Sequence, residues 1–539
     1  MESLRPFIRR LPRLACGLLA AAGLIAAETP TALPPRPAKF KHTDFNDDGL
    51  FGDTLPVIQL IISKENIDHL IKTPREFVEL TLREKGAEPM EHCVVKLKGS
   101  AGSFRQITED RPGFSIRTAK THDQEFHGLS KFMLNNCAQD GTLLHEQIAG
   151  EMARAAGVPA SRCGHAYVTL NGKALGTYVL KEGFNKEFLS YFFPNTKGHL
   201  YDGGFVSEIN PDLQCEKGDP RDKSSLLELI GSFNETKPDI RLRRMERIVD
   251  IDAYLRHVAL EEILCHWDGY SFNRNNYRIY ENPADDKFAF ILHGMDQMFG
   301  DTRWYIFKTP SAAVPNAIWS DRKIRERFRA QFFAVYEQTF RHTDWPGRAI
   351  HVAAALNKRL APVDAEEAKR FDQRGKDAAG EISRRLECVR SQLEDASRLN
   401  QIGGRAVLGV NQYAWAGSSD KGDTTEVDLD GKNCLHLLIG EQKGGDFRLP
   451  LSLGQGNYRL TGKIRTAGVK PGKELKGKGA RLRISGDTSV ASLDGDHDWT
   501  EVSLDFTVRE ADPVLVFELR SPAGQAWLDR NSVSLTRLP

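Results

Sequence analysis

The chain has 539 residues, of which 40% are hydrophobic and 27% are charged, and its formal net charge is +1 at pH 7. This length predicts more than one globular domain, and a balanced charge without a basic stripe argues against a nucleic-acid partner. The eight cysteines are scattered and form no C-x-x-C pair. The sequence therefore predicts free buried thiols in place of a zinc site or a disulfide framework, with one or two bridges left open.

Residues 1–27 have the pattern of a secretory signal peptide. Several arginines precede an apolar run from Leu14 to Ala27, which is too short to span a membrane comfortably. Cleavage near Ala27 would leave a mature chain with no membrane span. We therefore expect the protein to be secreted, periplasmic or displayed at the cell surface.

Residues 28–55 are expected to be a linker, because residues 30–41 are rich in proline. The linker contains an acidic turn whose side chains match positions 1, 3 and 5 of an EF-hand calcium loop. These side chains are Asp44, Asn46 and Asp48. Position 12 is Leu55, although an EF-hand needs a glutamate there. A plain turn is therefore favoured, and a Ca²⁺ site at these three side chains is the alternative.

A loop of small residues follows a predicted strand over residues 94–97. Its members are Gly99, Ser100, Ala101, Gly102 and Ser103. Small residues directly after a strand let backbone N–H groups approach phosphate oxygens. The alternative is a glycine-rich turn that only reverses the chain.

Helical spacing follows over residues 141–157, with Glu146 and Glu151 on the polar side. In protein kinases, a helix glutamate pairs with the base that binds phosphate. For either glutamate, a solvated helix face is the alternative. Two strands over residues 165–170 and 176–180 come next, joined by an Asn-Gly pair that is typical of a hairpin.

The motif with the clearest chemistry is H-x-D-x-x-x-x-N, formed by His266, Asp268 and Asn273 after a predicted helix over residues 250–265. In protein kinases, an Asp and an Asn at this spacing accept the substrate hydroxyl proton and hold Mg²⁺. A predicted hairpin then delivers Asp296 just ahead of a Phe-Gly pair, where kinases place a second metal-binding Asp. The alternative is that these residues only build turns.

The order of these segments resembles the spore coat protein H (CotH) kinase-like family, a group of atypical secreted protein kinases. The resemblance spans residues 56–303 and rests on several ordered blocks. They are Lys98-Gly-Ser-Ala-Gly-Ser103, Arg111-Pro-Gly-Phe-Ser-Ile-Arg117, Leu134-Asn-Asn-Cys-Ala-Gln-Asp140, Gly176-Thr-Tyr-Val-Leu-Lys-Glu182, Asp268 to Tyr280 and Asp296 to Gly300.

The resemblance implies transfer of the ATP γ-phosphoryl group to Ser or Thr of secreted or surface proteins, with Mg²⁺ or Mn²⁺. Asp268 would be the catalytic base, and Asn273 and Asp296 would hold the metal. The family's phosphate-binding lysine corresponds here to Arg111, with Arg117 as the second candidate, and this departure favours weak activity or a pseudokinase. The implied nucleotide-binding residues are Gly99, Ser100, Gly102, Ser103, Arg111, Glu146 and Glu182.

Beyond Gly403-Gly404 the helical period gives way to alternating strands. Several short strands over residues 404–539 predict a β-sandwich or jelly roll, and their pattern resembles a carbohydrate-binding module. Three tryptophans could stack on the rings of a glycan partner, although each is more often a core aromatic. They are Trp415, Trp499 and Trp527.

These patterns predict an α+β chain with a two-lobed, atypical kinase-like domain over residues 56–400 and an all-β sandwich over residues 404–539. The predicted function is that of an exported protein kinase. The alternative is a non-catalytic surface or extracellular protein that uses a degenerate kinase fold and its sandwich to bind glycans.

Overall fold

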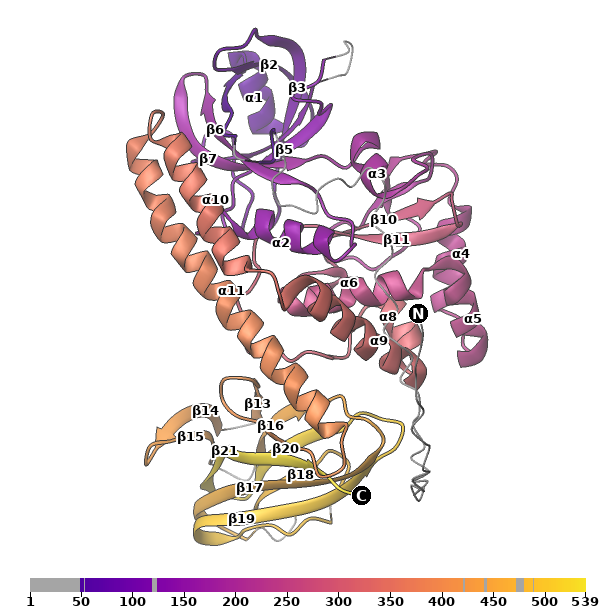
Figure 1. Ribbon diagram of the computed structural model, residues 1–539, viewed down its shortest axis with the longest axis vertical. Helices are drawn as coiled ribbons and strands as arrows, with labels where there is room; N and C mark the ends of the chain where they lie inside the picture. The colour runs from indigo at the N-terminus through magenta and orange to yellow at the C-terminus, as the bar shows by residue number, and fades with distance from the viewer. Residues whose placement is uncertain are drawn as a thin grey trace, which may run out of the picture.

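The computed structural model describes residues 49–52, 54–118, 124–419, 422–440, 444–471, 479–487 and 489–539. The predicted signal peptide, most of the predicted linker and the Ca²⁺ candidates Asp44, Asn46 and Asp48 lie outside these ranges. Within them, no helix is long and apolar enough to cross a membrane, and the cysteines are free thiols. As the sequence predicts, helices and sheets mix up to residue 399 and only strands follow (Figure 1).

A closed barrel forms the first part of the described chain, with the strand order β1-β2-β3-β4-β5-β7-β6. Its strands are β1 (Val57–Ile61), β2 (Val78–Glu84), β3 (Met90–Lys98), β4 (Gly113–Arg117), β5 (Lys131–Asn135), β6 (Cys163–Leu170) and β7 (Lys173–Glu182). Neighbouring strands are antiparallel except β1 and β6, which are parallel. Alternate side chains point into the barrel and form its apolar core.

The alternation along β3 decides which side chains leave the barrel. Val95 and Leu97 are buried in its core, so Lys96 and Lys98 point outward. Helix α2 (His145–Ala155) packs against the barrel at β6, and its first nine residues are all buried. Lys98 therefore emerges at the end of its strand, close to a buried helix.

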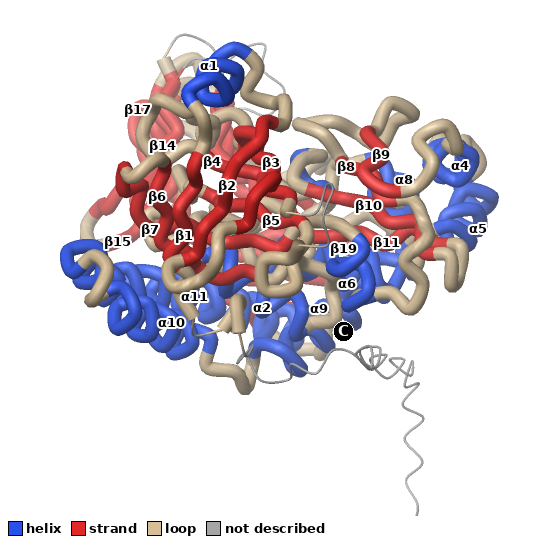
Figure 2. Tube along the Cα trace, turned by 90° about the horizontal axis from the view of Figure 1, so that it is seen from above, coloured by secondary structure: helices blue, strands red, loops and turns tan. Residues whose placement is uncertain are grey.

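A four-stranded sheet and a set of helices follow the barrel. The strands are β8 (Leu200–Asp202), β9 (Gln214–Lys217), β10 (Tyr277–Asn282) and β11 (Lys287–Leu292), in the order β11-β10-β8-β9. The helices are α1 (Lys64–Lys72) on the barrel, α3 (Lys186–Phe192), α4 (Ser224–Phe233), α5 (Pro238–Ile248), α6 (Ile251–Ile263), α7 (Tyr270–Asn273), α8 (Ala313–Trp319), α9 (Arg322–Val335), a π-helical turn (Tyr336–Phe340), α10 (Trp345–Leu360) and α11 (Ala365–Leu399). Figure 2, a view along the longest axis, shows α4 and α5 on one side of the molecule and α10 and α11 on the other.

Helix α6 differs from its prediction. The helical spacing of apolar residues over 250–265 predicts one apolar stripe, but the helix is buried on nearly all sides, including its polar residues His257, Glu261 and Glu262. A helix packed on all sides holds its end firmly in place. The motif that begins at His266 follows directly from this fixed end.

Two sheets face each other after residue 404, and we call them the sandwich. Their strands are β12 (Arg405–Val407), β13 (Ala416–Ser419), β14 (Gly422–Leu429), β15 (Lys432–Ile439), β16 (Gly444–Pro450), β17 (Gly456–Val469), β18 (Gly479–Ile484), β19 (Gly495–Val508), β20 (Val514–Arg520) and β21 (Gly524–Arg537). One sheet has the order β14-β15-β21-β17-β19, with β12 beside β21, and the other has the order β13-β16-β20-β18. Both contribute apolar side chains to one core.

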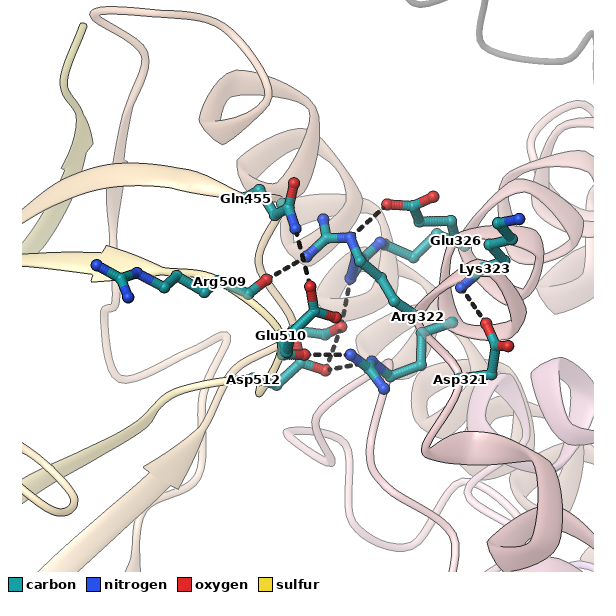
Figure 3. Close-up of polar contacts among 12 residues, drawn as sticks. Asp321, Arg322, Lys323, Glu326, Gln455, Arg509, Glu510 and Asp512 are labelled. Atoms are coloured by element: carbon teal, nitrogen blue, oxygen red, sulfur yellow. Dashed lines mark hydrogen bonds and ion pairs between the residues drawn. The ribbon is translucent and has the colours of Figure 1, made fainter. Parts of the chain in front are cut away.

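The sandwich contacts the helices beyond the chain connection. Leu399, the last residue of α11, is buried in the sandwich core, and Tyr305 packs against both this core and the core of the helices. In Figure 3, Arg322 of α9 donates a hydrogen bond at 2.6 Å to the carbonyl oxygen of Arg509 in the sandwich. The end of α11 is thus part of the sandwich structure, although the predicted boundary lies at residues 403–404.

This packing predicts that a sandwich cut out at the glycine pair is destabilised. Fragment 404–539 lacks Leu399 and also Asp395, which accepts a 3.0 Å hydrogen bond from the buried hydroxyl of Tyr413. Its free energy of unfolding should be about 2–4 kcal/mol below that of fragment 386–539, the loss typical of a deleted buried leucine. Urea unfolding measures the difference, and Leu399→Ala in the longer fragment should reproduce most of it. Equal stabilities would contradict this role of α11.

Candidate active site

A pocket of about 930 Å³ lies where the barrel meets the segments that follow α6 and β11, and we call it the central pocket. Lys98 and Asn135 of the barrel line it, together with residues of α2 and of the segments that follow α6 and β11. The predicted site residues among its lining are Gly99, Ser100, Gly102, Ser103, Glu146, Asp268, Asn273 and Asp296. The fold therefore gathers most of the predicted site in one place.

The small-residue loop is a tight turn that requires both of its glycines. Gly99 and Gly102 have φ angles of +109° and +82°, which other residues rarely adopt. A Cβ atom on Gly99 would also lie 2.9 Å from backbone atoms further along the loop. Within the turn, the hydroxyl oxygen of Ser103 accepts a hydrogen bond from the N–H of Ser100 at 3.1 Å. Ser103 thus holds the loop in shape.

Four polar side chains form a buried network behind this loop. Lys181 of β7 pairs with Glu146 of α2, and both side chains are almost fully buried. Asn135 donates a hydrogen bond to Glu146 at 2.5 Å and accepts one from the ammonium group of Lys98 at 2.6 Å. Burial would raise the pKa of Glu146, but Lys181 and Lys98 lower it below its usual value. A charged helix glutamate thereby fixes, through Asn135, the lysine that lines the central pocket.

Asp268 is held by three side-chain amides. The donors are the Nδ2 groups of Asn273, Asn275 and Asn276, at 2.5, 2.9 and 2.7 Å from its carboxylate. Hydrogen bonds from amides hold a carboxylate in one orientation, and a catalytic base must be positioned in this way. The ring N–H of His266 donates to the carbonyl oxygen of His293 at 2.9 Å, which ties this turn to the segment carrying Asp296. The asparagines do build a turn, and they build it around Asp268.

Asp296 is a half-buried carboxylate in the same pocket. Within the described residues, its carboxylate has no ion pair and no hydrogen bond from another side chain. Burial and the nearby charge of Glu146 raise its pKa to about 6, although Lys98 and Lys181 act in the opposite direction. The described chain contains no group of three His, Cys, Asp or Glu side chains placed to hold a metal ion. A metal at Asp296 would therefore need further oxygen ligands from amides or from its substrate.

Two predicted nucleotide-binding residues do not line the central pocket. Arg111 has a left-handed backbone with φ of +52°, donates to the carbonyl oxygen of Thr177 and lies over the ring of Tyr178 at 5.4 Å. Glu182 forms an ion pair with Arg162 at 2.7 Å. Both residues hold parts of the barrel together, so the structure does not bring them to the site.

The other candidates also have different partners. Arg117 is exposed and lies over the ring of Phe77 at 4.4 Å, and Glu151 pairs with Arg348 of α10 at 2.9 Å. Sequence reasoning missed Lys98 and Lys181. For Lys98 a signal was available, since it directly precedes the loop and alternates with buried Val95 and Leu97. For Lys181 there was none, because its partner Glu146 lies on a separate helix, 35 positions earlier in the chain.

Comparison with known families gives one match over most of this region. A family model described as "CotH kinase protein" matches residues 95–389. Among curated proteins, "Invasin CotH2" of Rhizopus delemar is 24% identical over 191 residues, which are 31% of this chain and 32% of the relative. "Spore coat protein homolog 1" of the same organism is 21% identical over 187 residues, 31% of this chain and 30% of the relative. The chain thus spans about a third of the length of these relatives.

Two solved structures are distantly similar to parts of this chain. The Golgi casein kinase with Mn/ADP bound is 11% identical, with a TM-score of 0.20 over 62% of this chain and 78% of that one. The carbohydrate-binding module TmCBM61 in complex with β-1,4-galactotriose is 13% identical, with a TM-score of 0.18 over 23% of this chain and 88% of that one. Likenesses at these scores are too weak to bear on function.

Proposed function

Because this chain belongs to the CotH kinase family, we propose that it is an exported, metal-dependent protein kinase that transfers the γ-phosphoryl group of ATP to serine or threonine side chains of other proteins. The observation that carries the proposal is the convergence of a tight glycine loop, a glutamate-fixed lysine and two aspartates on one pocket. Phosphoryl transfer depends mainly on positioning and charge neutralisation, and these groups are suited to both. In this proposal, the barrel acts as one lobe of a kinase, and the four-stranded sheet with the helices that follow the barrel acts as the other.

The residues present fit a divalent cation. Asp296 has a carboxylate without an ion-pair partner among the described residues, and Asn273 adds an amide oxygen. Carboxylate and amide oxygens are the hard ligands that Mg²⁺ and Mn²⁺ prefer. Mg²⁺ is usually bound by one or two carboxylates together with substrate phosphates, so a set of three acidic side chains is not required. When bound, such a cation would neutralise charge on the phosphates. Asp268, oriented by its three amides, would accept the proton of the substrate hydroxyl.

The phosphate clamp is assigned to Lys98 in place of Arg111. Lys98 lines the central pocket directly beside Gly99, whereas Arg111 is bonded within the barrel. A lysine provides a compact charge that can approach phosphate from the pocket wall. If Lys98 is the phosphate-binding lysine, Arg111 no longer stands in its place. The arginine at position 111 is then no argument for a pseudokinase.

Lys98→Met should weaken ATP binding by roughly tenfold or more, because it removes one charge-assisted contact to phosphate. Arg111→Met should leave ATP affinity within about twofold, because its guanidinium does not reach the pocket. Titration of a fluorescent ATP analogue in Mg²⁺ measures both. The opposite ranking of the two variants would return the clamp to Arg111.

The direct test of the function is transfer from radiolabelled ATP. Purified chain should phosphorylate itself or an added Ser/Thr protein with Mg²⁺ or Mn²⁺ and lose this activity with a chelator. Mass spectrometry of the product should place the phosphate on Ser or Thr. Nucleotide binding without any transfer to protein would contradict the proposal and favour the non-catalytic alternative.

A glycan is a second candidate ligand, at the outer face of the sandwich. Trp415 is buried in the sandwich core, so it is not available to a sugar. Trp527 is only half-buried and stacks on His436 with ring centroids 4.9 Å apart and planes at 10°. Trp499 is likewise half-buried, with the ammonium of Lys432 5.9 Å from its ring. Aromatic faces next to polar groups are suited to sugar rings.

If the sandwich binds a glycan, the full chain should be retained on an insoluble polysaccharide, and Trp527→Ala should release it. Stacking on one aromatic is worth about 1 kcal/mol, so retention should fall roughly fivefold. Leu438→Ala is the matched control, because Leu438 is exposed on β15 of the same sheet and has no ring. Equal retention of the parent and the Trp527 variant on every polysaccharide that binds would contradict a site at this face.

A further inference from the structure

A second hollow of about 730 Å³ adjoins the central pocket, and we call it the α11 groove. One side is the loop that leads into α2, and the other is the face of α11 that carries Lys376, Gly380 and Arg384. The two hollows meet at Trp267, which lines both. Trp267 directly precedes Asp268, and half of its surface is exposed. The groove therefore leads to the residue that would accept the proton of the substrate hydroxyl.

Glycine inside α11 has no packing reason at position 380. The helix has 35 residues and contains two glycines, and glycine is disfavoured within helices. Gly375 is explained by packing, because a Cβ there would lie 2.6 Å from the Cβ of Ala353 on α10. At Gly380, a Cβ would meet only the movable end of the Arg384 side chain, at 3.2 Å. Gly380 therefore leaves the floor of the groove without a side chain.

The acidic side chains that line the groove have hydrogen-bond partners within the protein. Asp140 accepts hydrogen bonds from the N–H groups of Thr142 and His145. Glu381 pairs with the His145 ring at 2.7 Å. Asp377 accepts a hydrogen bond from the side-chain amide of Gln373 at 2.8 Å. Asp140 and Glu381 therefore have partners that offset their charge, whereas Asp377 keeps its negative charge because its partner is a neutral amide.

The cations of the groove are available. Over the described residues, neither Lys376 nor Arg384 forms an ion pair or a side-chain hydrogen bond with another residue. The pKa of Glu381 is lowered chiefly by its hydrogen bond with His145 and, to a smaller extent, by the nearby charge of Arg384. The two cations are eight positions apart with Gly380 midway, so all three residues share one face of the helix. An open floor between two unpaired cations is complementary to an acidic chain.

We propose that the α11 groove binds an acidic, extended segment of the protein substrate. Lys376 and Arg384 bind carboxylates on that segment, and the exposed ring of Trp267 packs against the residue next to the acceptor. The acceptor hydroxyl then reaches Asp268. This inference rests on the proposed kinase function and gives its substrate a chemical class.

The probe is a fluorescein-labelled 13-residue peptide with one central Ser and Asp or Glu at alternate positions, together with a twin that carries Lys at those positions. Two variants of the full chain close the groove in different ways: Lys376→Glu with Arg384→Glu reverses its charge, and Gly380→Leu fills its floor with a better helix former. Matched controls on exposed helix positions outside the groove are Lys358→Glu with Arg359→Glu, and Ser383→Leu. Anisotropy measures peptide affinity, and radiolabelled ATP measures transfer.

The parent should bind the acidic peptide at least tenfold more tightly than its twin. Both groove variants should lose at least tenfold in affinity and raise the KM for the acidic peptide, while the KM for ATP stays at the parent value. The controls should behave as the parent. Equal affinity for both peptides, or unchanged affinity in both groove variants, overturns the proposal. Tight groove-dependent binding without any transfer would support the groove and count against the kinase function instead.

Discussion

Replacing Asp296 by asparagine should lower phosphoryl transfer by about 1,000-fold, since it removes the carboxylate that would hold the metal, and metal stabilisation of the transition state is worth several kcal/mol. The stability of the fold should not decrease. The carboxylate of Asp296 has no ion-pair partner among the described residues, so its neutral amide removes an unfavourable buried charge. The free energy of unfolding in metal-free buffer should therefore stay the same or rise.

Transfer from radiolabelled ATP and thermal unfolding with and without Mn²⁺ measure these two effects. Mn²⁺ with ATP should raise the melting temperature of the parent and leave that of the variant unchanged, because only a state that binds a ligand is stabilised by it. Asp286→Asn is the matched control, since Asp286 is exposed in a turn with φ of +55°, where asparagine is tolerated. Transfer retained in the Asp296 variant, or lost equally in the control, would rule out this metal site.

The aspartates of the site could be predicted because local sequence fixes them. Asp268 and its three asparagines lie within nine residues, so their spacing alone sets most of the turn that binds the carboxylate. Asp296 follows a hairpin of two short strands, whose alternation is visible in the sequence. In both cases, the interaction that positions the residue is close in sequence.

The lysines could not be predicted in the same way, because their positions depend on barrel closure. Lys181 faces Glu146 only because β7 pairs with β5, which sets the register of Lys181 opposite Met133. A register shift of one residue would have placed its neighbour Glu182 there. The family resemblance points to Arg111 as the match to the phosphate-binding lysine, but its left-handed backbone, which turns it toward the barrel, leaves no signal in the sequence.

The sandwich was visible in the sequence, and its limit was not. Alternation over residues 404–539 reflects strands with one face in the core and one outside, as in β17 and β19. The sequence predicts the boundary at Gly403-Gly404, where the helical period ends, yet the last residue of α11 is buried in the sandwich core. Periodicity reports secondary structure, and it does not report which core a helix end enters.

Breaking the buried Lys181–Glu146 pair should have the largest effect on stability. Glu146→Leu leaves the ammonium group of Lys181 buried without its carboxylate partner, and Lys181→Met leaves the carboxylate of Glu146 buried without its ammonium partner. Each single variant should therefore lower the free energy of unfolding by about 3–5 kcal/mol. The double variant should recover most of this loss, because two apolar side chains of similar size replace the pair. Urea unfolding of the parent, the two single variants and the double variant gives the coupling energy.

Phosphoryl transfer should not recover in that double variant. Lys98 is held by Asn135, which is held by Glu146, so removal of the carboxylate frees the lysine from its place at the pocket wall. The matched control is the other buried pair of the same helix, Glu151 with Arg348. Its double variant, Glu151→Leu with Arg348→Met, should recover both stability and transfer, because that pair lies outside the central pocket. If the Glu146 double variant also recovered transfer, the pair would serve only the fold, and Lys98 would not depend on it.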